Sequence, residues 1–197
     1  MTSFPINRPA RLFTRTEVLQ RPSPIPKTPG LYAWYFRGVP QGVPTDGCVT
    51  FNGNTLLYLG IAPDRANKPN SRASLLSRIR YHYCGDAKGS TLRRTLGVLL
   101  EPKSGYPLRR VGSGKRITLT HAGEQYIDKW MAKNAFVAWM PHPKPWTVES
   151  TLLREISCPL TIKDNDHHAF AAVLKKMRTE ALQRARAMPI ANEHNQR

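Results

Sequence analysis

Three short segments are apolar at almost every position, and they limit the folds open to this chain more than any other feature. They are GLYAWYF at 30–36, TLLYLGI at 55–61 and AFVAWM at 135–140. Successive side chains of a strand point to opposite faces of a sheet, so a strand that is apolar throughout needs cover on both faces. We therefore predict three core strands of a small sheet that is covered by helices.

The segments between these strands show helical periodicity, without the regular strand–helix alternation of a doubly wound fold. We therefore predict an α+β fold. A helix at 71–83 should begin at Ser71 or Ser74, and the last helix should bury Val173 and leave Arg178 in water. Helices are expected at 14–19, 71–83, 90–100, 123–134, from Thr147 to before Pro159, and 166–187, with a basic two-stranded hairpin inside 106–120 around Gly112–Gly114.

With 197 residues, the chain is long enough for one domain with a proper core. Prolines crowd residues 1–29, which we predict to be an irregular N-terminal arm. A single domain should occupy 30–187, with a long loop or hairpin at 37–54 and a long insertion at 101–134. Residues 188–197 should form a flexible tail.

Charge is the strongest global property, because thirty Lys and Arg oppose thirteen Asp and Glu for a formal net charge of +17. A strongly positive electrostatic field favours binding of nucleic acid, because contacts between basic side chains and phosphates release counterions. The alternatives are a solubility surface or adhesion to acidic membranes, but no strongly apolar amphipathic helix supports a membrane role.

The sequence also argues against several other classes of protein. The sequence contains no run of 18 apolar residues, so a membrane span is not expected, and its N-terminus lacks an apolar signal core. The three cysteines have no CxxC spacing, so reduced, buried thiols in a cytoplasmic protein are the simplest interpretation. The sequence contains no GxxxxGK[ST] motif, so a nucleotide cofactor is not expected.

The stretch TVESTLLREI at 147–156 aims a carboxylate at its own core. At about 100° per residue, Glu149 lies on the apolar stripe formed by Leu152, Leu153 and Ile156, whereas Glu155 points away from it. Burying an unpaired carboxylate is costly, so Glu149 should have a cation, a metal ion or a water-filled crevice beside it. The alternative is a glutamate at a helix end that reaches outward to solvent.

In order along the chain stand GLY at 30–32, YLG at 58–60, LLSRIRYHY at 75–83, VESTLL at 148–153 and Asn165. This order resembles the GIY-YIG nuclease family. The resemblance implies a small, mostly antiparallel central sheet flanked by helices, and cleavage of DNA phosphodiesters with one divalent metal ion. Two connections, 33–57 and 101–134, are longer than is usual in that family.

Carried over residue by residue, the resemblance implies a catalytic role for Tyr32, Tyr58, Arg78, His82 and Glu149. Glu149 would bind one Mg²⁺ or Mn²⁺ ion, and Asn165 would be a structural residue near the site. Arg78 would hold the scissile phosphate, and one of the two tyrosines would take the proton of the attacking water. Tyr32 is the favoured base, with Tyr58 as the alternative. His82 could contact phosphate or relay the proton.

Taken singly, each of these residues has a simpler interpretation. Strand tyrosines are more often core packing, and Asn165 could cap the last helix. Asp166, His167 and His168 look metal-binding, but adjacent residues at a helix start do not easily converge on one ion.

We therefore predict a divalent-metal-dependent DNA endonuclease, of a restriction-like or repair-like kind. The alternative is a non-catalytic basic module of the same fold that binds nucleic acid; a hydrolase acting on small molecules is a weaker third. A homodimer is compatible with cleavage of both strands, because one site cleaves one strand. Duplex DNA should contact the basic hairpin and the last helix, through Arg109, Arg110, Lys115, Arg116, Lys175 and Lys176.

Overall fold

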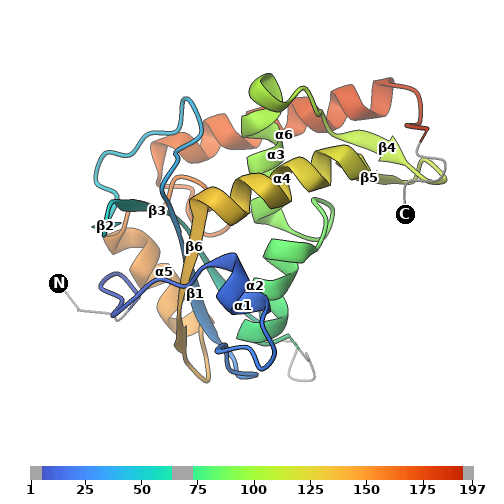
Figure 1. Cartoon of the computed structure of the whole chain (residues 1–197). Coiled ribbons are helices and arrows are strands. Elements are labelled where there is room, and N and C mark those ends of the chain that lie inside the picture. Colours follow the sequence, from blue (N-terminus) through green and yellow to red (C-terminus); the bar gives the residue numbers. More distant parts are fainter. Residues whose placement is uncertain (1–5, 64–72, 193–197) are drawn as a thin grey trace.

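The fold centres on an antiparallel sheet in the order β2-β3-β1-β6 (Figure 1). It is seen in a computed structural model that describes residues 6–63 and 73–192. All three expected strands are present, as β1 (Gly30–Phe36), β3 (Asn54–Ala62) and β6 (Ala135–Pro141). Every residue of β1 is buried, as a strand with apolar residues on both faces requires.

The prediction of three strands has to be corrected to four, because β2 (Thr50–Phe51) adds a short edge strand. It is joined to β3 by Asn52 and Gly53, whose φ angles of 48° and 71° are both left-handed. An Asn-Gly pair favours such a two-residue hairpin turn, because these two residue types tolerate positive φ. The expected long connection at 37–54 therefore ends in the sheet.

The two faces of the sheet have separate cores. Tyr32, Trp34 and Phe36 belong to the larger core, with side chains from α2 (Leu75–Cys84), α3 (Thr91–Ser104), α4 (His121–Asn134) and α6 (Ala169–Ala187). Leu31 and Ala33 belong to the smaller core, with side chains from α5 (Trp146–Glu155). Figure 1 shows α5 on the opposite side of the sheet from the other long helices.

A bulge in β3 determines which face Tyr58 occupies. Trp34 pairs with Tyr58 and Tyr35 pairs with Leu56, so Leu57 is an extra residue in the ladder. As a result, Leu57 and Tyr58 both join the larger core, on the face that carries Tyr32. The carbonyl of Leu57 accepts a hydrogen bond from the amide of Leu160 at 2.9 Å. Bulges of this kind commonly redirect a side chain next to a functional site.

Several predicted helix ends differ from the observed ones. The helix α5 begins after Pro145 and ends at Glu155, before Pro159 is reached. Thr147 is not its cap, because the Thr147 hydroxyl donates to the carbonyl of Lys144 at 2.7 Å. In contrast, Ser74 caps α2, as one of the two expected alternatives, and Ser90 caps α3. The other alternative, Ser71, lies outside the described residues.

Three burial predictions are also wrong. Val173 of α6 is 49% exposed rather than buried, and Arg178 of the same helix is half-buried rather than exposed. Among the cysteines, Cys158 is buried but Cys84 is exposed.

Described segments towards both ends of the chain pack against the domain. In the N-terminal arm, α1 (Arg15–Leu19) is preceded by a β-bridge between Phe13 and Val137. Two further strands, β4 (Arg109–Val111) and β5 (Arg116–Thr118), form a hairpin of their own. Residues 188–191, expected to belong to the tail, lie along this hairpin, where the amide of Ala191 donates to the carbonyl of Arg110. No helix of the described residues is long and apolar enough to span a bilayer.

Candidate active site

The two motif tyrosines lie side by side on β1 and β3, with ring centroids 6.5 Å apart. Their positions depend on the glycines of the two motifs. A Cβ atom on Gly60 would lie 2.6 Å from the hydroxyl oxygen of Tyr32, and one on Gly30 would lie 2.4 Å from the carbonyl oxygen of Met140. Both glycines are therefore needed for close packing, because no real side chain fits at these distances.

His82 connects Tyr32 to the start of α3. Its Nε2 atom lies 2.9 Å from the Tyr32 hydroxyl, and its Nδ1 atom lies 2.7 Å from the Ser90 hydroxyl. Burial lowers the pKa of His82 well below its usual value, and the charges of Arg78 and Arg93 lower that pKa further. The ring is therefore neutral at pH 7, with one nitrogen that donates and one that accepts.

Arg78 and Glu149 bring opposite charges to the two phenols. The Arg78 side chain hydrogen-bonds to Tyr32, and its Nη1 atom donates to the carbonyl of Gly89 at 3.0 Å. Glu149 is 6% exposed, so its carboxylate faces inward, as the stripe on its helix predicts. It also lies close enough to raise the pKa of both tyrosines.

The two phenols differ in how readily they ionise. Burial raises the pKa of Tyr32 well above its usual value, and the neighbouring Tyr58 raises it further, against the influence of Arg78. Burial also raises the pKa of Tyr58, but Arg78 and a hydrogen bond from Tyr32 favour its ionised form. Tyr58 is also the more accessible of the two, at 7% exposure against 1%. It is therefore the easier of the pair to ionise.

The folded chain thus brings the other four expected catalytic side chains, Tyr58, Arg78, His82 and Glu149, close to Tyr32. A model of the GIY-YIG catalytic domain matches residues 30–180. The chain belongs to the GIY-YIG family. Its family is therefore one of nucleases, enzymes that hydrolyse phosphodiester bonds. Neither a curated protein nor a solved structure gives a significant match.

Asn165 supports the edge of β3 in this GIY-YIG domain. Its side-chain amide donates to the carbonyls of Cys158 and Thr161, at 3.0 and 2.9 Å. The Thr161 hydroxyl in turn bonds to the amide and carbonyl of Leu59. Asn165 therefore fixes the segment that covers β3 beside Tyr58. It is not the cap of α6, because His168 fills that place.

The Asp166-His167-His168 run does not form a metal site. The His167 ring contacts the carbonyl of Leu153 at 2.8 Å, and the His168 ring contacts the hydroxyl of Ser157 at 3.0 Å, so the two rings diverge. Across residues 6–63 and 73–192, no three His, Cys, Asp or Glu side chains gather as a metal cluster would require.

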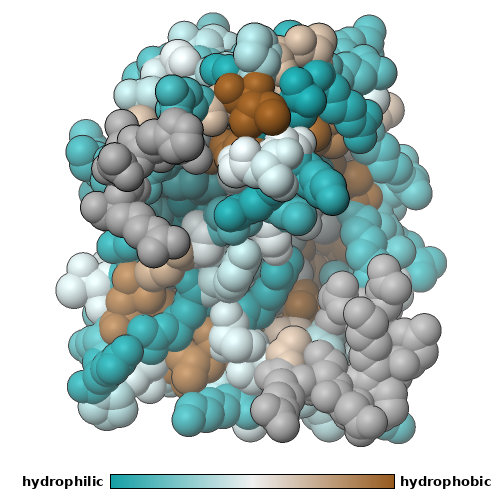
Figure 2. Space-filling view, turned by 90° about the vertical axis from the view of Figure 1, so that its right-hand side faces the viewer, coloured by the Kyte–Doolittle hydropathy of each residue, from teal (hydrophilic) through white to brown (hydrophobic). Residues whose placement is uncertain are grey.

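Five of the six basic residues expected to contact DNA have partners within the domain. Arg109 and Arg110 donate to the carbonyls of Pro189 and Met188, and Arg116 pairs with Asp86. Lys175 pairs with Asp166 and Lys176 with Glu180, while Lys115 is exposed. Figure 2, which views the molecule from the right of Figure 1, shows a mainly hydrophilic surface on that side.

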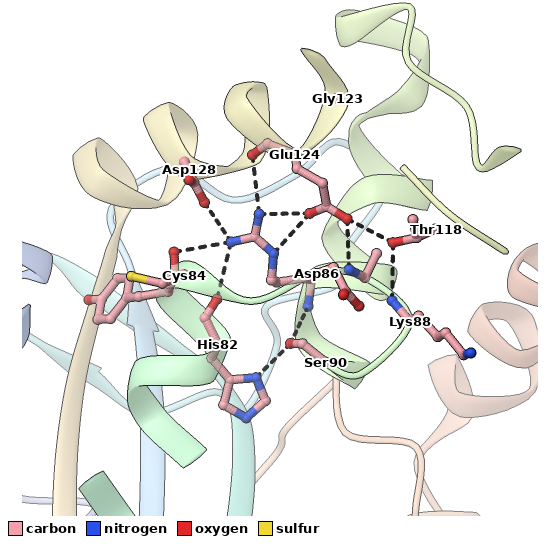
Figure 3. A network of polar contacts seen from close by, with 12 residues as sticks. His82, Cys84, Asp86, Lys88, Ser90, Thr118, Gly123, Glu124 and Asp128 are labelled. Atoms are coloured by element: carbon pink, nitrogen blue, oxygen red, sulfur yellow. Dashed lines mark hydrogen bonds and ion pairs between the residues drawn. The ribbon is translucent and has the colours of Figure 1, made fainter. Parts of the chain in front are cut away.

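Sequence analysis missed Arg93, whose side chain is fully buried. Its Nε and Nη2 atoms donate to one carboxylate oxygen of Glu124 at 3.0 and 2.7 Å, and Nη1 donates to Asp128 at 2.6 Å. The Nη1 atom also donates to the carbonyl of Tyr83 at 3.1 Å, and the Arg93 amide donates to the Ser90 hydroxyl at 3.1 Å. Figure 3 shows this network reaching from α4 down to the ring of His82.

The signal for Arg93 was present in the sequence. It lies three residues before Leu96 on α3, beside that helix's apolar stripe, as Glu149 does on its own helix. Glu124 and Asp128 are four residues apart on α4, so they share one helix face and meet the same cation.

Proposed function

We propose that this GIY-YIG protein is a divalent-metal-dependent endonuclease that hydrolyses DNA phosphodiester bonds. The observation that carries the proposal is the meeting of one guanidinium, two phenols and one buried carboxylate around Tyr32. A high net positive charge supports a polyanionic substrate.

Arg78 would hold the scissile phosphate and stabilise the charge that develops on its oxygens. Its Nη1 atom is oriented by the carbonyl of Gly89, so part of the ordering cost is met before DNA binds. A guanidinium suits this role because its fork of donors matches two phosphate oxygens.

We assign the general base to Tyr58 rather than to Tyr32. The support is that Tyr58 has the smaller burial, accepts a hydrogen bond from Tyr32 and lies near the charge of Arg78. In that role the phenolate oxygen of Tyr58 would accept the proton of the attacking water. Tyr32 would then be a positioning residue that stabilises the phenolate.

This assignment also selects one arrangement of protons on His82. If Tyr32 donates to Tyr58, the Nε2–H group of His82 donates to the oxygen of Tyr32. The Nδ1 atom then accepts from the hydroxyl of Ser90, whose oxygen accepts from the amide of Arg93. Each member of this chain strengthens the next, because neighbouring hydrogen bonds polarise one another.

Glu149 fits a hard divalent cation, Mg²⁺ or Mn²⁺, which can bind through one carboxylate together with water and substrate phosphate. The fit rests on a buried, inward-facing carboxylate on a helix whose neighbouring stripe residues are apolar. A bound ion would supply charge relief for the leaving oxygen.

A plasmid assay tests the proposal directly. The purified protein should nick supercoiled DNA with Mg²⁺, and chelator should abolish the nicking. Arg78→Ala and Glu149→Ala should each reduce the rate by about a hundredfold or more, whereas Glu155→Ala on the exposed side of the same helix should not. Binding without any metal-dependent nicking would instead support the non-catalytic module.

The product of the same assay bears on oligomeric state. One site cleaves one strand, so a monomer should produce nicked circles first. Linear plasmid formed without a nicked intermediate would support a homodimer, whereas slow conversion of nicked to linear plasmid would argue for independent cuts.

A further inference from the structure

The turn at 86–89 holds two arginines next to each other. Arg78 donates to the carbonyl of Gly89 at 3.0 Å, and Arg94 donates to the carbonyls of Ala87 and Lys88 at 3.0 and 2.8 Å. Because the accepting carbonyls are consecutive, the guanidinium from α2 and the one from α3 are brought to the same short turn.

The turn itself is held by two hydrogen bonds from outside and one within it. Its Ala87 amide donates to Glu124 at 2.8 Å, its Lys88 amide donates to Thr118 at 3.2 Å, and its Gly89 amide donates to Asp86 at 2.9 Å. Asp86, whose charge raises the pKa of Arg94 against the effect of burial, is already engaged with Arg116. The turn therefore presents its arginines on a rigid base.

A third arginine approaches from α6. Arg178 is half-buried, and within the described part of the chain it makes neither a hydrogen bond nor an ion pair. Burial lowers its pKa, the charge of Arg94 lowers that pKa further, and Tyr58 raises it. The helices α3 and α6 also pack against each other, and Arg184 of α6 pairs with Glu101 of α3 at 2.8 Å. Arg178 therefore lies near both Arg94 and the phenol that we assign as the base.

A half-buried cation without an acid, beside a second cation, is unfavourable for the folded protein alone. A bound anion removes this cost, and a phosphate accepts several hydrogen bonds from guanidinium groups. The position beside Tyr58 means that an anion here would lie close to the phosphate at Arg78.

We propose that Arg94 and Arg178 form a second phosphate-binding subsite, which holds a DNA backbone phosphate neighbouring the one that is cleaved. The proposal rests on the proposed nuclease function, and it names the part of the substrate that this corner of the site binds. The two arginines share one phosphate, Arg94 held in place by the turn and Arg178 added from α6.

Duplex binding in the presence of chelator tests the subsite separately from cleavage. We expect Arg178→Gln to weaken binding of a short duplex about tenfold. It should also flatten the plot of log K against log salt by about 0.9, the value for one phosphate contact. The matched control is Arg186→Gln, which removes the same charge from an exposed position of the same helix. Equal effects of the two variants would overturn the proposal.

The double variant tests whether the phosphate is shared. If Arg94 and Arg178 bind one phosphate, the salt slope of Arg94→Gln/Arg178→Gln should fall by about 0.9 in total, and the losses of affinity should be less than multiplicative. A fall of about 1.8 with multiplicative losses would mean two separate contacts and would overturn the shared subsite. If Arg94→Gln does not fold, the slope of Arg178→Gln alone decides.

Thermal unfolding separates binding from structure. Arg178 has no partner to lose, so Arg178→Gln should leave the Tm of the free protein unchanged or raise it, whereas a fall of more than about 3 °C would show a structural role and overturn the proposal. If the wild type never nicks DNA, but the arginine variants change its DNA affinity and salt slope as expected, the nuclease function fails and the subsite stands. If the wild type nicks DNA, but the arginine variants leave its affinity and salt slope unchanged, the nuclease function stands and the subsite fails.

Discussion

Replacing Glu124 by alanine should destabilise this domain more than any surface substitution, although Glu124 lies on α4, outside the family motifs. The carboxylate accepts from Arg93 at 3.0 and 2.7 Å, and the Arg93 side chain is fully buried. Its second oxygen accepts from the amide of Ala87 and the hydroxyl of Thr118, both at 2.8 Å. One substitution therefore removes four hydrogen bonds, two of them to a buried cation.

The magnitude follows from what is left behind. Asp128 would remain as the acid beside Arg93, and its side chain is 35% exposed. Removing one partner of a buried ion pair costs about 3–5 kcal/mol, since the other charge is left without full compensation. In a domain of this size, 1 kcal/mol corresponds to about 2–4 °C, so the Tm should fall by about 6–20 °C.

Differential scanning calorimetry on Glu124→Ala and Glu155→Ala is the assay. Glu155 is exposed, so its removal should change stability by no more than about 0.5 kcal/mol. Glu124→Gln keeps the shape and loses the charge, and should fall between the two. If Glu124→Ala and Glu155→Ala unfold at the same temperature, the Arg93 network does not stabilise the fold and the reasoning fails.

Three further predictions concern the site and its surroundings. Because the pKa of Tyr58 is raised, the base is mostly protonated at pH 7, so the cleavage rate should rise about tenfold per pH unit between pH 7 and 9. Tyr58→Phe should remove this rise, and a wild-type cleavage rate that does not change with pH would refute the assignment of the base. The pKa of His82 is lowered in the fold, so the unfolded chain binds a proton first as the pH falls. The free energy of unfolding should therefore decrease by up to about 1.4 kcal/mol per pH unit below about pH 6.5. Urea titrations at pH 5 and 7 should show this decrease, and His82→Gln should reduce it. Neutralising the hairpin residue Lys115, which has no internal partner in the described structure, should flatten the salt dependence of DNA binding without lowering the Tm, and an unchanged slope would exclude the hairpin from the interface.

The core of the fold could be predicted because it depends on local pattern. The strand at 30–36 is apolar on both faces, and β1 begins and ends at those residues. The inward direction of Glu149 follows from helix periodicity in the same way. A hairpin was one of two alternatives for 37–54, but the position of β2 as a fourth strand of the sheet was not predicted, because a strand of two residues has no periodicity of its own.

Other features depend on partners far away in the chain. Arg109 and Arg110 resemble free surface charges in the sequence, yet each donates to a carbonyl about eighty positions later, in the segment after α6. Which of Tyr32 and Tyr58 ionises more readily depends on a few per cent of exposed surface and on a β-bulge, neither of which is encoded in the motif tripeptides. These properties arise only when the elements pack together.

The long connection at 101–134 is part of the support of the site, as its contacts show. Through Glu124 it holds both Arg93 and the amide of Ala87. Arg93 in turn fixes Ser90 and hence the ring of His82, while the Ala87 turn orients the guanidinium beside it. Deleting the connection would leave a buried cation without its acid, so we expect the shortened chain to lose its fold along with its site. An inserted segment with such contacts could change in sequence only where it faces solvent, and substrate differences between relatives should therefore arise on its outer surface.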